Sequence, residues 1–261
     1  MENQIGAEYE VKTARTVFII IEILQANDGL TLTETAERLD KSIGATHNHL
    51  KTLEKLGYVV NRDGEYHVGL QFLHHGMHAL RQQRVARVAS DPLEKLAEET
   101  AEFIWLVTEE RGKAFALQKH LGERAVQTDG NVGRPLYMHC TANGKAILAT
   151  LPESRVEEIV AEHGLPARTE HTITDVDELY DDLERTRERG YAINDEESVL
   201  GERAIACAVA DDEETYGAVS VSGPTHRITD SRIEDELVGN LLGTVNEIVL
   251  RLNYDANEPQ R

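Results

Sequence analysis

The pattern of apolar and polar positions predicts that the chain begins with three helices and a hairpin. Apolar residues recur at helical spacing, with polar or glycine residues between the runs, so helices are expected over 13–26, 33–39 and 42–56. Alternation then predicts two strands, 58–61 and 66–68, joined by an Asp-Gly turn. This order is that of a winged helix-turn-helix.

Residue types at the helix ends support these boundaries. Thr33 is expected to cap the second helix and Ser42 the third, because a side-chain oxygen there can accept hydrogen bonds from first-turn N–H groups. Gly57 is expected to end the third helix, since glycine easily adopts the left-handed conformation that follows a helix.

The rest of the chain predicts a connector helix and an α+β unit. A helix is expected over 70–84, and a new unit begins near Asp91. The elements expected in it are, in chain order, a helix to about residue 101, strands over 103–108 and 115–120, helices over 142–150, 152–163 and 176–189, strands over 191–194, 204–209 and 216–222, and a helix from 230 to about 253. Strand pairs separated by helices favour an antiparallel sheet with helices on its faces.

The third helix has two unlike faces. One arc is apolar and is expected to pack on the first two helices; its members are Ile43, Thr46, Leu50 and Leu53. The opposite arc has small residues that let a partner approach closely, an asparagine suited to the edge of adenine, and lysines suited to phosphates. With flanking residues and an arginine at the hairpin, the residues predicted to bind double-stranded DNA are Lys41, Ser42, Gly44, Ala45, Asn48, Lys51, Thr52, Lys55 and Arg62. The alternative is an ordinary amphipathic helix with a solvated face.

The charge of the chain is unexpected for a protein that binds DNA. Its 261 residues include 47 Asp and Glu against 27 Lys and Arg, a formal net charge of −20. Residues 41–55 reverse this balance locally, because their lysines outnumber their one acid, Glu54. Elsewhere the acids are spread along the chain, which favours a solvated acidic surface. We therefore predict a halophilic, salt-adapted protein, since multimolar salt shortens the Debye length to about 3 Å or less and screens self-repulsion.

Other features limit the location and chemistry of the protein. No apolar run reaches the roughly 18 residues that a membrane-spanning helix needs, and the first residues are polar and acidic. We therefore expect a cytoplasmic protein without a signal peptide or a membrane partner. Two cysteines, Cys140 and Cys207, exclude a disulfide scaffold and are expected to be free thiols, with one pairing between them as the alternative.

Three later segments resemble the signatures of one family. VGRPLYMHCTANGKAIL (132–148) is similar to the loop-and-helix signature of IclR-type transcriptional regulators, in which Gly-Lys-Ala (144–146) is the most specific element. RGYAINDEESVLGERAIACAV (189–209) and AVSVSGPTHRIT (218–229) resemble two further signatures, and the N-terminal part resembles the family's winged domain. The chain is therefore identified as a member of this family over roughly residues 10–255.

The resemblance implies a winged helix-turn-helix DNA-binding domain over 10–69, a connector helix over 70–90 and a GAF-like effector-binding domain over 91–255. It also implies a homodimer or dimer of dimers, no cofactor, and a small-molecule effector such as an organic acid, an aromatic acid or a sugar derivative. The implied role is ligand-responsive regulation of catabolic genes. Asn48 stands where the family commonly has arginine, which shifts the predicted base preference from guanine toward adenine.

Carried onto this sequence, the family's effector site falls in the three signature segments. The loop before the Gly-Lys-Ala helix and two serines of a strand face the ligand, which gives Asn143, Gly144, Ser220 and Ser222. N–H groups at a helix start suit an anion, and residues two apart on a strand share a face. Asn194 and Ala204 replace a carboxylate and a cysteine of many members, so the predicted pocket has fewer polar groups.

Some charged residues near these signatures have structural alternatives. Lys145 is as consistent with a salt bridge as with a charge in the pocket. Glu196 and Glu197 resemble an acid–base pair, but adjacent residues of a strand point to opposite faces. We therefore interpret both glutamates as structural or rim residues.

Other residues suggest metal or enzyme chemistry only weakly. His74, His75 and His78 fit dimer contacts or solvated histidines better than a metal site, because no cysteine or carboxylate with matching spacing accompanies them. His139 and Cys140 are neighbours in sequence. Adjacent residues rarely act as a base and its nucleophile, because the two side chains must also be adjacent in space. The alternatives to a regulator are an enzyme on the same fold that uses a cysteine, and a protein-interaction module that uses the winged helix.

Overall fold

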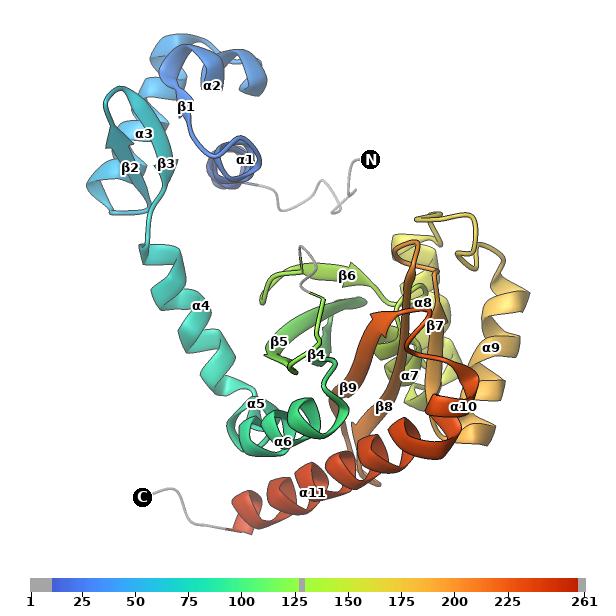
Figure 1. Cartoon of the computed structure of the whole chain (residues 1–261). Helices are drawn as coiled ribbons and strands as arrows, with labels where there is room; N and C mark the ends of the chain where they lie inside the picture. The colour runs from blue at the N-terminus through green and yellow to red at the C-terminus, as the bar shows by residue number, and fades with distance from the viewer. Residues whose placement is uncertain (1–10, 127–129, 258–261) are drawn as a thin grey trace. The chain divides into compact units, whose positions relative to one another are not determined.

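The computed structural model describes residues 11–126 and 130–257 and divides the chain into two compact units, Met1–Ala79 and Leu80–Arg261 (Figure 1). Each unit is described by itself. Within the described residues, no helix combines the length and apolar character that a membrane crossing requires.

The first unit is a winged helix-turn-helix. Its elements are α1 (Lys12–Ala26), β1 (Leu30–Thr31), α2 (Leu32–Leu39), α3 (Ile43–Lys55), β2 (Val59–Arg62), β3 (Glu65–Val68) and most of α4 (Gln71–Gln82). The strands pair antiparallel in the order β1-β3-β2. Between β2 and β3, Asp63 and Gly64 both have positive φ, 52° and 97°, as in the hairpin turn that matches strand twist. The predicted order of elements is confirmed, and β1 is an addition to it.

Polar caps begin the two helices of the helix-turn-helix. Ser42 caps α3 as predicted, since its Oγ accepts a hydrogen bond from the N–H of Ala45 at 3.3 Å. The prediction that Thr33 caps α2 is wrong. Thr31 caps this helix, and the Glu34 carboxylate accepts from the N–H of Thr31 at 2.9 Å. This reciprocal capping box needs an acidic residue three positions after the cap, which Thr33 lacks.

The core of the first unit lies between α1, α3 and the hairpin. Its fully buried members include Ile20, Leu24, Leu50 and Val59. The prediction that Ile43 joins this core is wrong, because its side chain is 54% exposed. Ile43 begins α3, and helical side chains lean toward the N-terminus, so it projects beyond the turns that pack.

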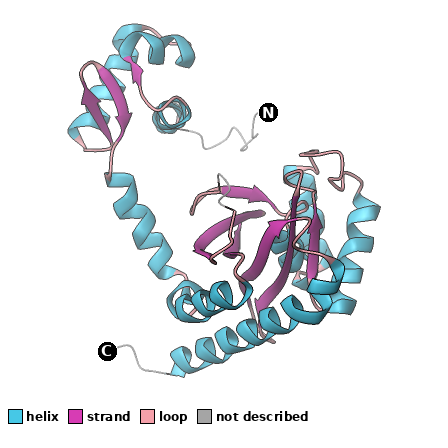
Figure 2. Cartoon of the chain, in the orientation of Figure 1, coloured by secondary structure: helices cyan, strands magenta, loops and turns pink. Residues whose placement is uncertain are grey.

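The second unit is a six-stranded antiparallel sheet with helices on both faces (Figure 2). Its elements are α5 (Arg84–Val88), α6 (Ser90–Thr100), β4 (Phe103–Glu110), β5 (Lys113–Leu121), β6 (Pro135–Tyr137), α7 (Ala142–Thr150), α8 (Glu153–His163), α9 (Val176–Arg189), β7 (Ala192–Asp195), β8 (Glu202–Ala210), β9 (Thr215–Pro224), α10 (Asp230–Arg232), η1 (Ile233–Leu237) and α11 (Val238–Asn257). The strand order is β6-β5-β4-β9-β8-β7. The α+β class is confirmed, while α5, β6 and the π-helical turn η1 are absent from the sequence prediction.

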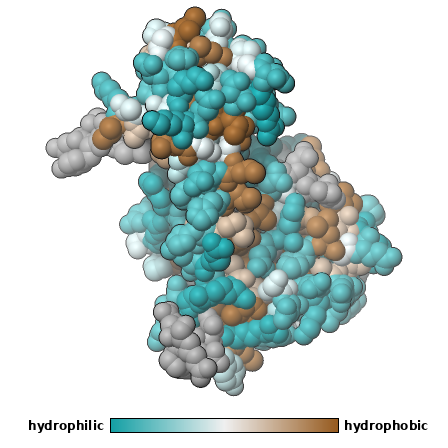
Figure 3. Space-filling model, turned by 90° about the vertical axis from the view of Figure 1, so that its left-hand side faces the viewer, coloured by the Kyte–Doolittle hydropathy of each residue, from teal (hydrophilic) through white to brown (hydrophobic). Residues whose placement is uncertain are grey.

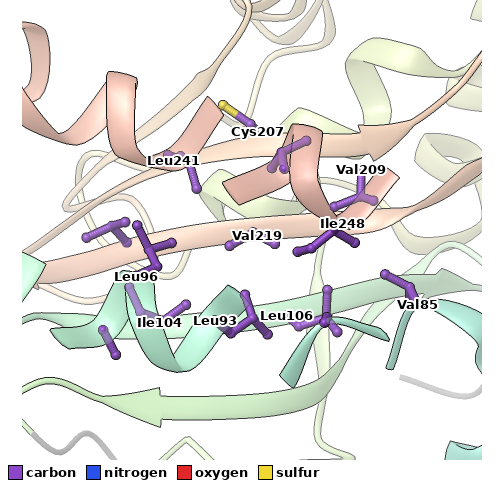
Figure 4. Close-up of a cluster of buried hydrophobic side chains, with 14 of the residues drawn as sticks. Val85, Leu93, Leu96, Ile104, Leu106, Cys207, Val209, Val219, Leu241 and Ile248 are labelled. Atoms are coloured by element: carbon purple, nitrogen blue, oxygen red, sulfur yellow. The ribbon is translucent and has the colours of Figure 1, made fainter. Parts of the chain in front are cut away.

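Alternation along the strands sorts residues between two cores. On β8, Cys207 and Val209 pack with α6 and α11 on one face of the sheet, where Leu93, Leu241 and other side chains meet them (Figure 4). Ala204, on the same strand, belongs to the core with α7 and α9 on the opposite face. This period of two is the geometry of a strand buried on both sides. Both cysteines are buried and free, so the prediction of two thiols is confirmed.

Candidate functional sites

The residues predicted to bind DNA all lie exposed on the first unit. Apart from Arg62, at the end of β2, they belong to α3 or to the two residues before it. Lys51 donates to the Glu54 carboxylate at 2.7 Å, and this bond raises the pKa of Lys51. Lys41 and Lys55 form no ion pair with any residue that the structure describes, so their ammonium groups face water.

Gly44 is exposed on α3, yet neither its backbone nor its packing calls for glycine. Its φ lies outside the left-handed region, and a Cβ built on it meets no atom within 4 Å. Glycine inside a helix costs about 0.5–1 kcal/mol relative to alanine. The missing side chain at Gly44 therefore leaves room for a partner to approach the backbone of α3, and it lowers the stability of the helix.

The second unit contains a cavity of about 560 Å³ between the sheet, the segment that enters α7 and the loop after β7. Strand register fixes its floor. Ala204 on β8 lies opposite Asn194 on β7 and Ser222 on β9, and Ser220 lies opposite Trp105 on β4. Five strands, β4, β6, β7, β8 and β9, and one helix, α7, thus contribute side chains to one space.

Most of the residues predicted to contact the effector line this cavity, namely Asn143, Asn194, Ala204, Ser220 and Ser222. Gly144 is not on the cavity wall. Its N–H donates to Thr141 Oγ1 at 3.2 Å, and a Cβ on it would collide with the backbone of Met138. The glycine therefore lets α7 pack against the preceding segment, and its N–H already has a partner within the helix cap.

Some polar atoms of the cavity already have hydrogen-bond partners in the protein, and others have none among the described residues. Asn143 donates through Nδ2 to Ser220 Oγ at 2.9 Å, but its buried Oδ1 accepts no hydrogen bond from the described residues. Asn194 uses both ends of its amide, accepting from the N–H of Glu197 and donating to Ser198. Asn143 Oδ1 is thus an unpaired acceptor in a buried, polar part of the wall.

Sequence reasoning missed several residues of the cavity. Trp105, Arg134, Arg168 and Glu202 also line it. For Glu202 a signal was present, because residues two apart on a strand share a face and Ala204 was already a candidate. The two arginines belong to loops, whose positions no periodicity predicts.

Lys145 lies outside the cavity wall in a buried ion-pair cluster. Its side chain is 1% exposed, and its Nζ lies 2.5 Å from the Glu197 carboxylate and 2.9 Å from that of Asp182. Burial raises the pKa of Glu197, and the Lys145 cation opposes this shift. Of the two alternatives for Lys145, the structure supports the salt bridge. Glu196 instead turns outward and accepts from the N–H of Gly201.

The candidate nucleophile and metal residues have other partners. His139 contacts the carbonyl of Pro166 at 3.2 Å, and burial raises the pKa of Cys140 to about 11, which keeps the thiol protonated. His75 hydrogen-bonds to Tyr58 Oη at 2.8 Å. In the described part of the chain, no group of three or more potential metal ligands comes together.

A winged helix-turn-helix combined with a cavity in a separate sheet domain is the architecture of a ligand-responsive DNA-binding regulator. Comparison with known proteins gives the family. Residues 77–250 match the family described as bacterial transcriptional regulator IclR C-terminal, and residues 14–60 match winged helix-turn-helix DNA-binding. The chain belongs to the IclR family of transcriptional regulators.

Individual relatives agree with this assignment. A probable HTH-type transcriptional regulator ArcR of Halobacterium salinarum is 32% identical over 238 residues, 89% of this chain and 90% of that protein. The crystal structure of the IclR of Thermotoga maritima has a TM-score of 0.76 and 27% identity, and the match covers 93% of this chain and 99% of that one. These relatives are regulators, which confirms the prediction of a regulator and not an enzyme.

A third comparison shows the fold alone. The structure of an IclR homologue from Microbacterium hydrocarbonoxydans, complexed with 4-hydroxybenzoate, has a TM-score of 0.80 at 18% identity, with 93% of this chain and 99% of that chain covered.

Proposed function

We propose that this regulator binds double-stranded DNA through the exposed face of α3, and that a small organic acid in the cavity changes its affinity for that DNA. The observation that carries the proposal is the cavity itself, where side chains from α7, β7, β8 and β9 converge around an unpaired acceptor, Asn143 Oδ1. The 4-hydroxybenzoate bound by the Microbacterium homologue supports an organic acid as the class of effector. The regulated genes are proposed to be catabolic, and the protein to act in the cytoplasm.

The DNA-binding part is tested by charge reversal on α3. DNA from upstream of the protein's own gene is titrated with the native protein and with the double variant Lys41→Glu, Lys55→Glu. Both lysines are exposed, so we expect unchanged folding and an affinity loss of more than about tenfold at every DNA sequence. Lys95→Glu, at an exposed lysine of the second unit, is the matched control and should bind normally. An equal loss of DNA affinity in the double variant and in the Lys95→Glu control would contradict the assignment of DNA binding to α3.

The acidic surface gives this DNA binding a particular salt dependence. Because few lysines of α3 neutralise phosphates, few counterions are released, and we expect log K to fall less steeply with log salt than in a basic homologue. Anisotropy titrations between 0.5 and 3 M potassium chloride, roughly the range of salt adaptation, measure this slope. A steep negative slope across that range would refute the prediction.

The effector part is tested by thermal shift with small organic acids, 4-hydroxybenzoate among them, because a ligand that binds only the folded protein raises its melting temperature. The double variant Ser220→Val, Ser222→Val keeps the strand but removes the hydroxyls of the cavity floor. We expect it to lose the shift. A shift that survives in this variant would place the ligand elsewhere.

We also propose a homodimer in which α4 contributes to the interface. Leu70, Leu73 and Met77, just before and on this helix, are 82%, 60% and 41% exposed and recur at helical spacing. Figure 3 shows apolar side chains gathered along this part of the molecule. Burying them between two copies would remove this surface from water. Light scattering should give twice the monomer mass, and Leu73→Lys should lower it; a native monomer would exclude the dimer.

A further inference from the structure

Glu202 puts a carboxylate into the cavity that neither the signatures nor the DNA-binding role explains. It begins β8 two residues before Ala204, and both line the cavity, as strand alternation requires. Its strand partner is Pro224, which lies two residues beyond Ser222 on β9. The carboxylate therefore extends the floor formed by Ala204 and Ser222 toward the loop after β7.

This carboxylate has no cation beside it. Within the residues that the structure describes, Glu202 takes part in no ion pair or side-chain hydrogen bond. The neighbouring Arg203 points to the other face of the strand, where it pairs with Asp195 at 3.5 Å and Asp230 at 2.5 Å. Burial raises the pKa of Glu202, and no nearby positive charge offsets it. Glu202 is half-buried and lines the cavity with no cation beside it, so the cavity is better suited to a ligand that brings a positive charge.

Positive groups stand elsewhere on the same wall. Arg134 and Arg168 line the cavity and are exposed, and neither forms an ion pair with the described part of the chain. The cavity thus holds cationic and anionic groups that do not neutralise one another. Asn143 donates through Nδ2 to Ser220, but its buried Oδ1 has no donor among the described residues, so the cavity also offers an unpaired acceptor.

On the basis of the proposed effector function, we infer that the effector is a zwitterion of the amino-acid class, whose ammonium group binds Glu202 and whose carboxylate binds the arginines. An ammonium supplies donors and a charge to Glu202, and a carboxylate accepts from guanidinium groups in the paired geometry that they favour. Asn143 Oδ1 accepts from a further donor of the ligand. A plain carboxylic acid would use the arginines and leave Glu202 uncompensated.

Trp105 provides the measurement. It is the chain's single tryptophan and lines the cavity, so its fluorescence reports binding there directly. The probes are the common L-amino acids, each matched to its 2-hydroxy acid, in which a hydroxyl replaces the ammonium. We expect at least one amino acid to bind about tenfold or more tightly than its 2-hydroxy acid, because a charge-assisted bond to Glu202 is lost in the latter.

Glu202→Gln tests the role of the carboxylate, since it keeps the size and removes the charge. We expect the preference for the amino acid over its 2-hydroxy acid to fall from about tenfold to about twofold or less. The matched control is Glu110→Gln, an exposed glutamate on β4 outside the cavity, which should keep the native preference. The same titrations on Arg168→Gln should weaken amino acids and 2-hydroxy acids alike.

The outcomes separate this inference from the proposed function. If 2-hydroxy acids, polyols or plain carboxylic acids bind as well as amino acids, or if Glu202→Gln keeps the preference, the zwitterion is overturned while the effector cavity stands. If no probe of any class changes Trp105 fluorescence or DNA affinity, effector binding in this cavity fails, and the inference fails with it. DNA binding by α3 is measured separately and is unaffected by that result.

Discussion

The face of α3 and the cavity of the second unit both depend on polar side chains, but they hold them in opposite surroundings. On α3 the lysines and Asn48 stand in water, and losing one of them costs the fold little. Around the cavity, Asn143 is buried with an Oδ1 that is unpaired within the described residues, and Glu202 is half-buried without a cation beside it. Both cost stability until a ligand supplies the missing partners. Exposed side chains on a helix need little support from the rest of the fold, whereas the side chains of a selective cavity must be held in place by the surrounding core.

The largest expected effect is on the stability of the second unit, which holds the cavity. Lys145→Met removes the cation from two buried carboxylates, Asp182 and Glu197, and we expect the unfolding free energy of the second unit to fall by about 3–5 kcal/mol. Urea unfolding followed by Trp105 fluorescence measures this unit. Lys95→Met, at a lysine that is 60% exposed, is the control and should unfold like the native protein. Indistinguishable midpoints for the two variants would mean that the cluster does not support the cavity.

On α3 we expect the reverse, a loss of recognition without a loss of stability. Asn48→Ala removes an exposed amide, so its stability should change by less than about 0.5 kcal/mol. Discrimination at one base pair should fall by about 1–3 kcal/mol, because the bidentate contact to adenine is lost. Titrations of the operator and of single-base-pair variants measure this. Uniform weakening on all sequences would show that Asn48 contacts the backbone and not a base.

Gly44→Ala should shift stability and DNA affinity in opposite directions. Alanine favours the helix by about 0.5–1 kcal/mol and meets no atom of the chain, so the melting temperature should rise. DNA affinity should fall if the methyl group intrudes between α3 and the duplex. Gly243→Ala, at an exposed glycine of α11 with equally open space, should stabilise the protein and leave DNA binding unchanged. Unchanged DNA binding by Gly44→Ala would exclude close approach at this position.

The smallest effect concerns the pH dependence of the second unit without ligand. Glu202 has a raised pKa in the folded protein, so the folded state binds its proton more readily than the unfolded state. Its contribution to stability is therefore present below about pH 4.5, the unfolded pKa, and is lost as pH rises through the higher folded pKa. Relative to Glu110→Gln, the variant Glu202→Gln should be stabilised at neutral pH by up to about 1 kcal/mol. No difference between the two variants at any pH would place Glu202 in ordinary solvent.

The winged domain was largely predictable from the sequence because its signals are local. The buried arc of α3, its cap Ser42 and the Asp63-Gly64 turn each depend on residues within a few positions of one another. The errors were local too. Thr31, not Thr33, caps α2 because of Glu34, and Ile43 is exposed because it begins its helix.

In the second unit, the strands and most helices also followed from periodicity. Of the six residues that the family signatures predicted for the effector site, five line the cavity. What the sequence alone determined is therefore the order of most elements, the buried arc of α3 apart from Ile43, and the family. Tertiary structure decided that Lys145 serves an ion-pair cluster, that Gly144 packs on Met138, and that Glu202 and two loop arginines share one cavity. The reason is physical: periodicity fixes which way a side chain points along its own element, but only strand register and helix packing bring distant side chains into one space.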